Sequence, residues 1–251
     1  MASLRVLDLL KHVFYWRIPV VILFILICGL LITFSPKKGM KILGIWAVLE
    51  AITTALGNIS LFVQYLYYQK IITSDFYTKG SYNTIITTAG IISFFLGITS
   101  NILMWLYAKR NYGTKKAPII VILSLIIGSI IARIIITVSF RDHEQLNMLL
   151  KALTISQAAF GIAITIIYLV IFFKNRSIER NVPKLWTFYL YGLITSIICI
   201  PLDIKANIDY NNDNFVASYM LICILFSIIT ICFYTYFTIR AYKREEIQAW
   251  N

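Results

Sequence analysis

Two charged side chains lie deep inside long apolar runs, and they are the residues of this sequence best placed to do chemistry. Glu50 follows Lys41 by nine residues, roughly 13 Å at the rise of an α-helix, and Arg133 precedes Arg141 by eight, roughly 12 Å. In a hydrocarbon core ~30 Å thick, these depths leave on the order of 5 Å between the two backbones, which an Arg side chain can cover. Ionisable residues inside a membrane usually pair. We therefore predict a Glu50–Arg133 ion pair.

Polar residues at helical spacing accompany Glu50. Thr54 and Asn58 follow it at intervals of four residues and share its helix face, beside a stripe of small residues at Ala47, Ala51 and Ala55. Two amides lie in other apolar runs. The predicted site comprises Glu50, Arg133, Thr54, Asn58, Asn101 and Gln157. Such residues either bind a ligand or ion, or serve only as polar contacts between packed helices.

The elements that position these residues are long apolar runs. Only 14% of the residues are charged, against about 25% in a typical soluble domain, and the mean hydropathy is +0.79. Because an open strand edge has no hydrogen-bond partners in lipid, these runs must be helices. The sequence predicts an all-α integral membrane protein, one seven-helix transmembrane domain over residues 1–251, with spans near 18–34, 42–68, 82–107, 118–140, 146–173, 185–202 and 215–239.

Two short segments flank the predicted bundle. Within residues 1–16, Leu4, Leu7, Leu10 and Phe14 lie largely along one helical flank, which predicts a short amphipathic interfacial helix that leads into the first span. Residues 240–251 form a short tail.

The basic residues predict the orientation. The loops between spans 1–2, 3–4 and 5–6, with the C-terminal tail, carry 14 of the 23 Lys and Arg residues. The N-terminus and the other loops carry 8, and Arg133 lies within a span. Because Lys and Arg favour the cytoplasmic side, we expect the N-terminus outside and the C-terminus in the cytoplasm.

Charge and residue content exclude several classes of function. The net charge of +12 is spread over short clusters between the apolar runs. Anionic lipid headgroups at the cytoplasmic face are therefore the expected partner, and nucleic acid is not. With only two histidines, with four cysteines all inside apolar runs, and with no phosphate-binding glycine pattern, the sequence predicts no metal, no cofactor and no catalytic residues. An enzyme is not expected.

Seven spans with an outer N-terminus resemble the heptahelical receptors in topology alone, since Tyr107-Ala108-Lys109-Arg110 replaces their acidic-Arg-aromatic triplet. We expect a receptor- or sensor-like protein with a polar intramembrane pocket for a small molecule or lipid. The alternatives are a small transporter or lipid-handling protein, and an accessory subunit that packs against a protein partner in the membrane. Broken helices would favour the transporter. The prolines of the spans, Pro19 and Pro201, both lie near span ends, which favours the receptor-like hypothesis.

The predicted orientation can be tested by cysteine labelling. With an impermeant thiol reagent outside intact cells, Asn211→Cys in the sixth loop should be labelled and Gly113→Cys in the third should not. Labelling of Gly113→Cys alone would reverse the orientation.

Overall fold

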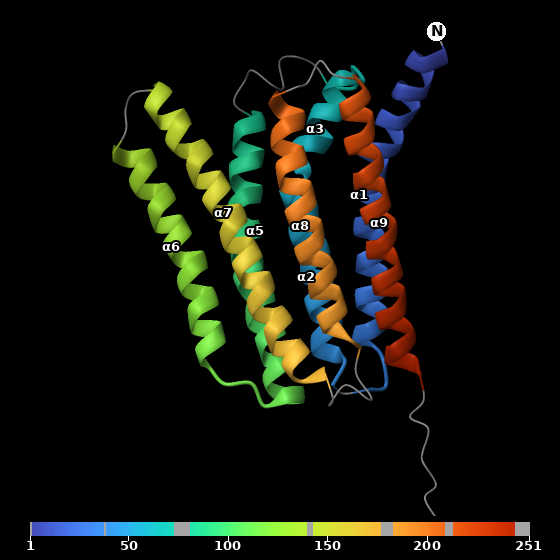
Figure 1. The fold of residues 1–251 in the computed structure, drawn as a ribbon, viewed down its shortest axis with the longest axis vertical. Helices are drawn as coiled ribbons and strands as arrows, with labels where there is room; N and C mark the ends of the chain where they lie inside the picture. Colours follow the sequence, from blue (N-terminus) through green and yellow to red (C-terminus); the bar gives the residue numbers. More distant parts are fainter. Residues whose placement is uncertain are drawn as a thin grey trace, which may run out of the picture. The chain divides into compact units, whose positions relative to one another are not determined.

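The computed structural model describes residues 2–37, 39–72, 81–139, 143–176, 183–208 and 213–243. Nearly all of these residues are helical, and no strand occurs among them. The helices, drawn in Figure 1, are α1 (Ala2–Thr33), α2 (Lys41–Gly57), α3 (Ile59–Tyr68), α5 (Ser81–Tyr112), α6 (Ala117–Ser139), α7 (His143–Lys174), α8 (Leu185–Ile208) and α9 (Asp213–Tyr242). The prediction of an all-α chain is thus confirmed for the described residues.

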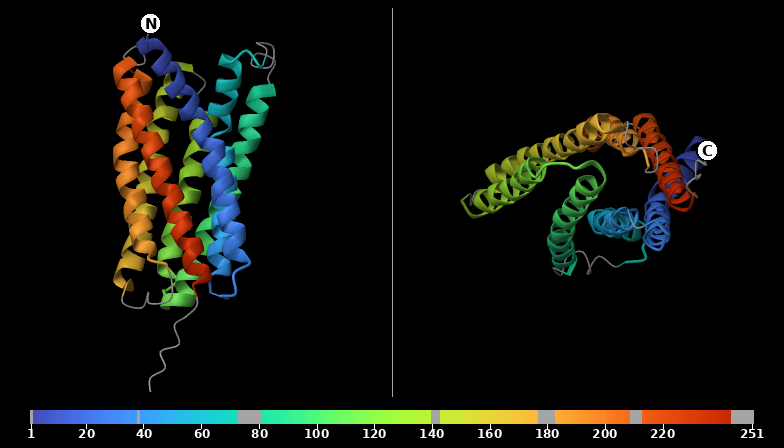
Figure 2. Two further views of the ribbon diagram at one scale, coloured as in Figure 1. Left: turned by 90° about the vertical axis from the view of Figure 1, so that its right-hand side faces the viewer. Right: turned by 90° about the horizontal axis from the view of Figure 1, so that it is seen from below.

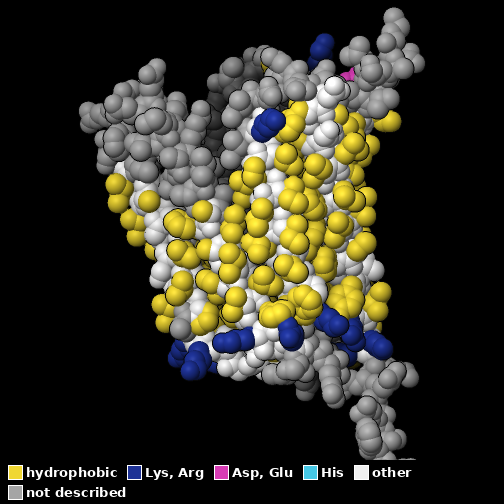
Figure 3. All heavy atoms as spheres, in the orientation of Figure 1, with side chains coloured by type: hydrophobic (Ala, Val, Ile, Leu, Met, Phe, Trp, Pro, Cys, Tyr) yellow, Lys and Arg dark blue, Asp and Glu magenta, His cyan; other side chains and the backbone are white. Residues whose placement is uncertain are grey.

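Several of these helices have the length and composition of membrane spans. Four qualify singly, namely Asp8–Thr33, Thr88–Tyr112, Leu185–Leu202 and Asn214–Tyr242, and a bent pair formed by α2 and α3 makes a fifth. Large apolar side chains such as Leu23, Ile131 and Ile197 remain about half exposed. Figure 3 shows hydrophobic side chains along the helices, with Lys and Arg side chains at helix ends. A lipid environment accounts for this apolar exposure, which water would disfavour.

The predicted second span, residues 42–68, is not one straight helix. α2 ends at Gly57, and the axes of the two halves differ by 50°. At the junction the Asn58 amide donates a hydrogen bond of 2.8 Å to the Thr54 carbonyl. This bond binds the amide to the last turn of α2, and a glycine beside it weakens the helix locally. The sequence, in which Pro19 and Pro201 are the prolines of the predicted spans, gives no sign of a bend at this position.

The chain divides into two compact units. Unit 1 contains residues 1–107, 181–183 and 202–251, and unit 2 contains residues 108–180 and 184–201. In unit 1, α1 packs against both α2 and α9, which Figure 2 shows beside it. In unit 2, α6 packs against α7, and the Phe172 ring contacts the rings of Tyr112, Tyr168 and Tyr189.

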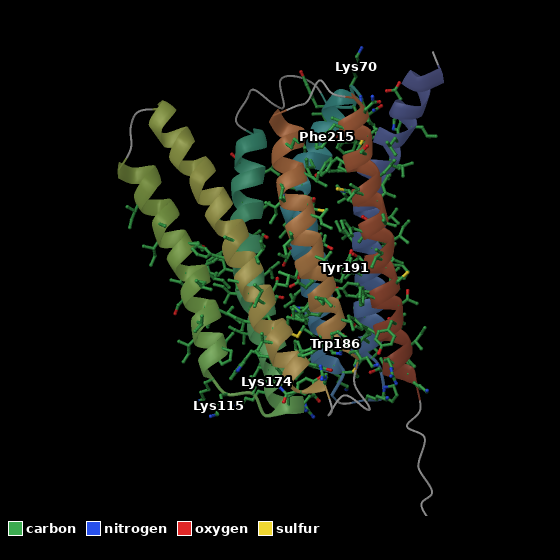
Figure 4. The ribbon with its side chains drawn as sticks, in the orientation of Figure 1. Lys70, Lys115, Lys174, Trp186, Tyr191 and Phe215 are labelled. Atoms are coloured by element: carbon green, nitrogen blue, oxygen red, sulfur yellow. The ribbon has the colours of Figure 1, made fainter. Side chains whose placement is uncertain are left out.

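Basic side chains gather at helix ends in each unit. In unit 1, Lys37 donates a hydrogen bond of 3.3 Å to the carbonyl of Arg240, which ties the α1–α2 loop to the end of α9. This end of unit 1, which also carries Lys41 and Lys243, is called the basic end. Lys70 and Phe215 lie at the opposite end, called the α3 end (Figure 4). In unit 2, Lys115 and Lys174 lie at a common end (Figure 4).

α1 and α2 approach closely because glycines lie in their contact. A Cβ built on Gly44 would lie 2.7 Å from Thr33 Cα and closer still to the Thr33 backbone nitrogen. A Cβ on Gly29 would lie 2.9 Å from the Val48 backbone nitrogen. Since backbone atoms cannot move aside as a flexible side chain can, no larger residue fits at these positions without separating the helices.

Gly44→Ala should therefore destabilise unit 1 by about 1–3 kcal/mol, the usual cost of overpacking. Thermal unfolding of the purified protein in detergent measures the change. Gly90→Ala on α5 is the matched control, because a Cβ there meets nothing within 4 Å. It should be neutral or slightly stabilising, since alanine favours helix by up to about 1 kcal/mol. Equal losses for both variants would contradict close packing at Gly44.

Candidate functional site

Glu50 lies in the middle of α2, and its carboxylate is bound by two neutral hydrogen-bond donors. The Ser100 hydroxyl of α5 donates to Glu50 Oε1, and the Trp46 side chain, one turn earlier on α2, also hydrogen-bonds Glu50. Ser100 is only 2% exposed, so this bond forms away from solvent. Donors of this kind compensate part of the cost of moving a carboxylate out of water.

Two further helices complete the surroundings of Glu50. Tyr234 of α9 interacts electrostatically with both Glu50 and Cys28 of α1. The Tyr234 and Trp46 rings are nearly parallel, with an interplanar angle of 13° and centroids 6.4 Å apart. Cys28, Trp46, Glu50, Ser100 and Tyr234 are called the Glu50 cluster. Four helices of unit 1 contribute to it, so its geometry depends on the packing of all four.

The Glu50 cluster has no cationic member among the described residues. None of the Lys and Arg side chains that the structure describes makes an ion pair with Glu50. Within the same described part of the chain, no three His, Cys, Asp or Glu side chains come together as metal ligands would. Glu50 therefore has two neutral donors and no cationic partner among the described side chains.

Three other residues of the predicted site hydrogen-bond within their own helices. Asn58 donates to the Thr54 carbonyl, and Asn101 donates to the Gly97 carbonyl over 2.8 Å. Ser100, the neighbour of Asn101, is the residue that contacts Glu50. Sequence spacing placed Asn101 near the right level of the right helix, but it did not identify which side chain faces α2.

The side chains of the remaining two residues of the predicted site are not described by the structure. Arg133 belongs to α6 and Gln157 to α7, and both side chains lie outside the described residues. The Glu50–Arg133 ion pair therefore stays a prediction.

Sequence reasoning missed four of the five members of the Glu50 cluster. Trp46 precedes Glu50 by one helical turn, so the i, i+4 rule could have found it. Cys28, Ser100 and Tyr234 are distant in sequence from Glu50. No sequence spacing links residues on different helices. Only the packing identifies them.

Ser100→Ala should destabilise the protein by about 1–3 kcal/mol, because it removes one of the donors of the buried Glu50 carboxyl group. Thr99→Ala is the matched control, since Thr99 is exposed and donates to the Phe95 carbonyl of its own helix. A double-mutant cycle of Ser100→Ala with Glu50→Gln, read by unfolding in detergent, measures the coupling between the side chains. Strictly additive losses would show that Ser100 and Glu50 act independently.

The chain was compared with known proteins. No protein-family model, no curated protein and no solved structure matches the chain. Its function is therefore inferred from its own residues.

Proposed function

We propose that the chain is a seven-span membrane transporter in which Glu50 takes up and releases a proton. The observation that carries the proposal is the Glu50 carboxyl group, which lies within a candidate span and has only neutral partners among the described residues. Ionisable residues at such positions mark ion pathways and proton relays in membrane proteins, because keeping a charge there has a cost that function must offset.

The chemistry of the Glu50 cluster suits a proton. A hydroxyl group can donate to a carboxylate and can accept from a carboxylic acid, so Ser100 can stay hydrogen-bonded to Glu50 in both protonation states. The Trp46 N–H is a donor only and supports the charged form. Ser100 therefore stays hydrogen-bonded to Glu50 in either form of the carboxyl group, as exchange of a proton requires.

The bend between α2 and α3 favours transport over reception. It lies at Asn58, eight residues after Glu50, or about 12 Å along α2. Broken helices beside a binding site are typical of transporters, since they allow one part of a helix to move while the other stays packed. The sequence alone favoured the receptor-like hypothesis because it showed no such break. The 50° bend favours the transporter hypothesis instead.

The topology proposed for the transporter is the one predicted from the sequence. Seven spans, an outer N-terminus and a cytoplasmic C-terminus would place the basic end of unit 1 against the anionic headgroups of the inner leaflet. The exposed Lys41 and Lys243 side chains support this placement. The same basic surface is the feature that supports the receptor-like alternative, because it would also suit an acidic cytoplasmic protein partner.

Glu50→Gln should abolish proton exchange at this position, because an amide does not titrate. The glutamine side chain has the same shape as the glutamate side chain, so the packing should be kept. Infrared spectra of the protein in lipid, recorded across a pH titration, follow the carboxylic acid carbonyl band directly. We expect one titrating band in the parent protein that is missing from Glu50→Gln. We also expect this variant to abolish protein-dependent acidification of dye-loaded liposomes under a membrane potential.

Asp8→Asn is the matched control, since Asp8 is an exposed acid of α1 and lies outside the Glu50 cluster. It should keep both the band and the acidification. Identical spectra for the parent and Glu50→Gln, or acidification that survives Glu50→Gln, would refute the proposed role.

A further inference from the structure

The start of α2 carries positive charge that no described side chain offsets. Its first turn contains Lys41 and no acidic residue, and no side chain caps its N-terminus. A helix N-terminus already has a partial positive charge, so it favours acids and disfavours cations. The structure describes two acidic side chains, Asp8 near the start of α1 and Glu50 in the middle of α2, and neither lies at the basic end. In the described part of the chain, the start of α2 therefore has no neutralising anion.

Ser35 lies level with this first turn of α2. The two helices run antiparallel, and Thr33 packs against Gly44. Each step forward from Thr33 is therefore matched by a step back from Gly44, which places Ser35 opposite the first turn of α2. The turn that closes the loop fits the same register, because the Met40 N–H donates to the Lys37 carbonyl over 2.9 Å.

The Ser35 hydroxyl is buried in this loop and has no described partner. Ser35 is 2% exposed, although its neighbours Phe34 and Pro36 are exposed, so its side chain is turned inward. Its Oγ atom has no hydrogen-bond partner among the described residues. Buried hydroxyls usually have a partner, so this donor can serve a bound group.

The end of α1 does not need this hydroxyl. The carbonyls of Leu30 and Ile32 accept backbone N–H groups of the loop, and the Leu31 carbonyl accepts the Tyr242 hydroxyl over 2.9 Å. The acceptors at the end of α1 are thus bonded, whereas the first N–H groups of α2 have no acceptor within their helix and no side-chain cap. Because donors and positive charge remain, the loop suits an anion and not a cation.

The Lys37 ammonium group can add to such a site without leaving its present contact. Its hydrogen bond to the Arg240 carbonyl is 3.3 Å long and uses one of its three N–H groups. Lys41 and Lys243 are exposed at the same end of unit 1. Lysine attracts phosphate as a point charge, and a helix N-terminus binds it through backbone N–H groups.

We propose that the start of α2 binds the phosphate group of an anionic lipid. The Ser35 hydroxyl and the uncapped N–H groups of α2 donate to the phosphate oxygens, while Lys37 and Lys41 supply the charge. A lipid is the source because the neighbouring Phe34 side chain is 78% exposed and the loop follows a candidate membrane span. One phosphate would then contact the α1–α2 loop and, through Lys37, the end of α9.

The proposal assigns to one defined site the headgroup contact that the sequence predicted only for a whole face of the protein. It goes beyond the proton exchange proposed for Glu50 and does not depend on it.

Lys41→Gln and Ser35→Ala test the site, and Lys70→Gln at the α3 end is the matched control (Figure 4). The delipidated protein in detergent is titrated with phosphatidic acid, and the rise in Tm gives an apparent affinity. We expect each site variant to bind about tenfold more weakly, the equivalent of one lost hydrogen bond to a charged group. Lys70→Gln should bind as the parent does. Zwitterionic phosphatidylcholine and free inorganic phosphate should raise Tm far less.

The same site variants should behave differently without lipid. In lipid-free detergent, Lys41→Gln should raise Tm, because it removes a cation from the positive end of α2. Ser35→Ala should keep or raise Tm, because it removes a buried hydroxyl that has no described partner. Residues that only hold the loop in place would instead lower Tm with and without lipid, and that result would contradict the site.

Three further outcomes would overturn the proposal. An equal loss of affinity in Lys70→Gln would show a general attraction between opposite charges. Unchanged affinity in Ser35→Ala would remove the buried hydroxyl from the site. Equal stabilisation by inorganic phosphate would assign the site to a soluble anion. None of these measurements involves Glu50, so a failure here is distinct from a failure of the proposed proton exchange.

Discussion

The hydrogen bond from Ser100 to Glu50 is the interaction on which the rest of unit 1 depends. A carboxylate inside an apolar helix bundle is costly unless donors reach it, and Ser100 is the donor that comes from another helix. To bring α5 to this distance, unit 1 must hold α1, α2, α5 and α9 at fixed levels. This one contact therefore positions α5 against α2, stabilises the buried Glu50 carboxyl group and takes part in the proposed proton exchange.

The close approach of α1 and α2 sets the frame for that contact. Gly29 and Gly44 allow backbone to pack on backbone, which leaves no room for sliding. The Trp46 ring, two residues after Gly44, is consequently held against Tyr234 while it donates to Glu50. Small residues far from the carboxyl group therefore control its geometry.

The sequence predicted the helices better than it predicted the site. The predicted sixth span, 185–202, coincides with the candidate span Leu185–Leu202, because hydropathy and length suffice for long apolar helices. The break at Asn58 was missed, since an amide that bonds its own helix leaves no signal like that of proline. Glu50 was found because a charge is conspicuous in an apolar run. Ser100 and Tyr234 were not, because periodicity identifies the face of a helix and not the helix that it meets.

The composition of the Glu50 cluster also has a consequence for biogenesis. Its members come from α1, α2, α5 and α9, so the last of them is synthesised after nearly the whole chain. Until α9 inserts, Trp46 lacks the Tyr234 ring on which it stacks. Two hydrogen bonds to α9 are also missing, from Lys37 to the Arg240 carbonyl and from Tyr242 to the Leu31 carbonyl. A nascent chain therefore carries an incompletely shielded carboxyl group through most of its insertion. Unit 1 is thus complete only when its last helix has packed against its first.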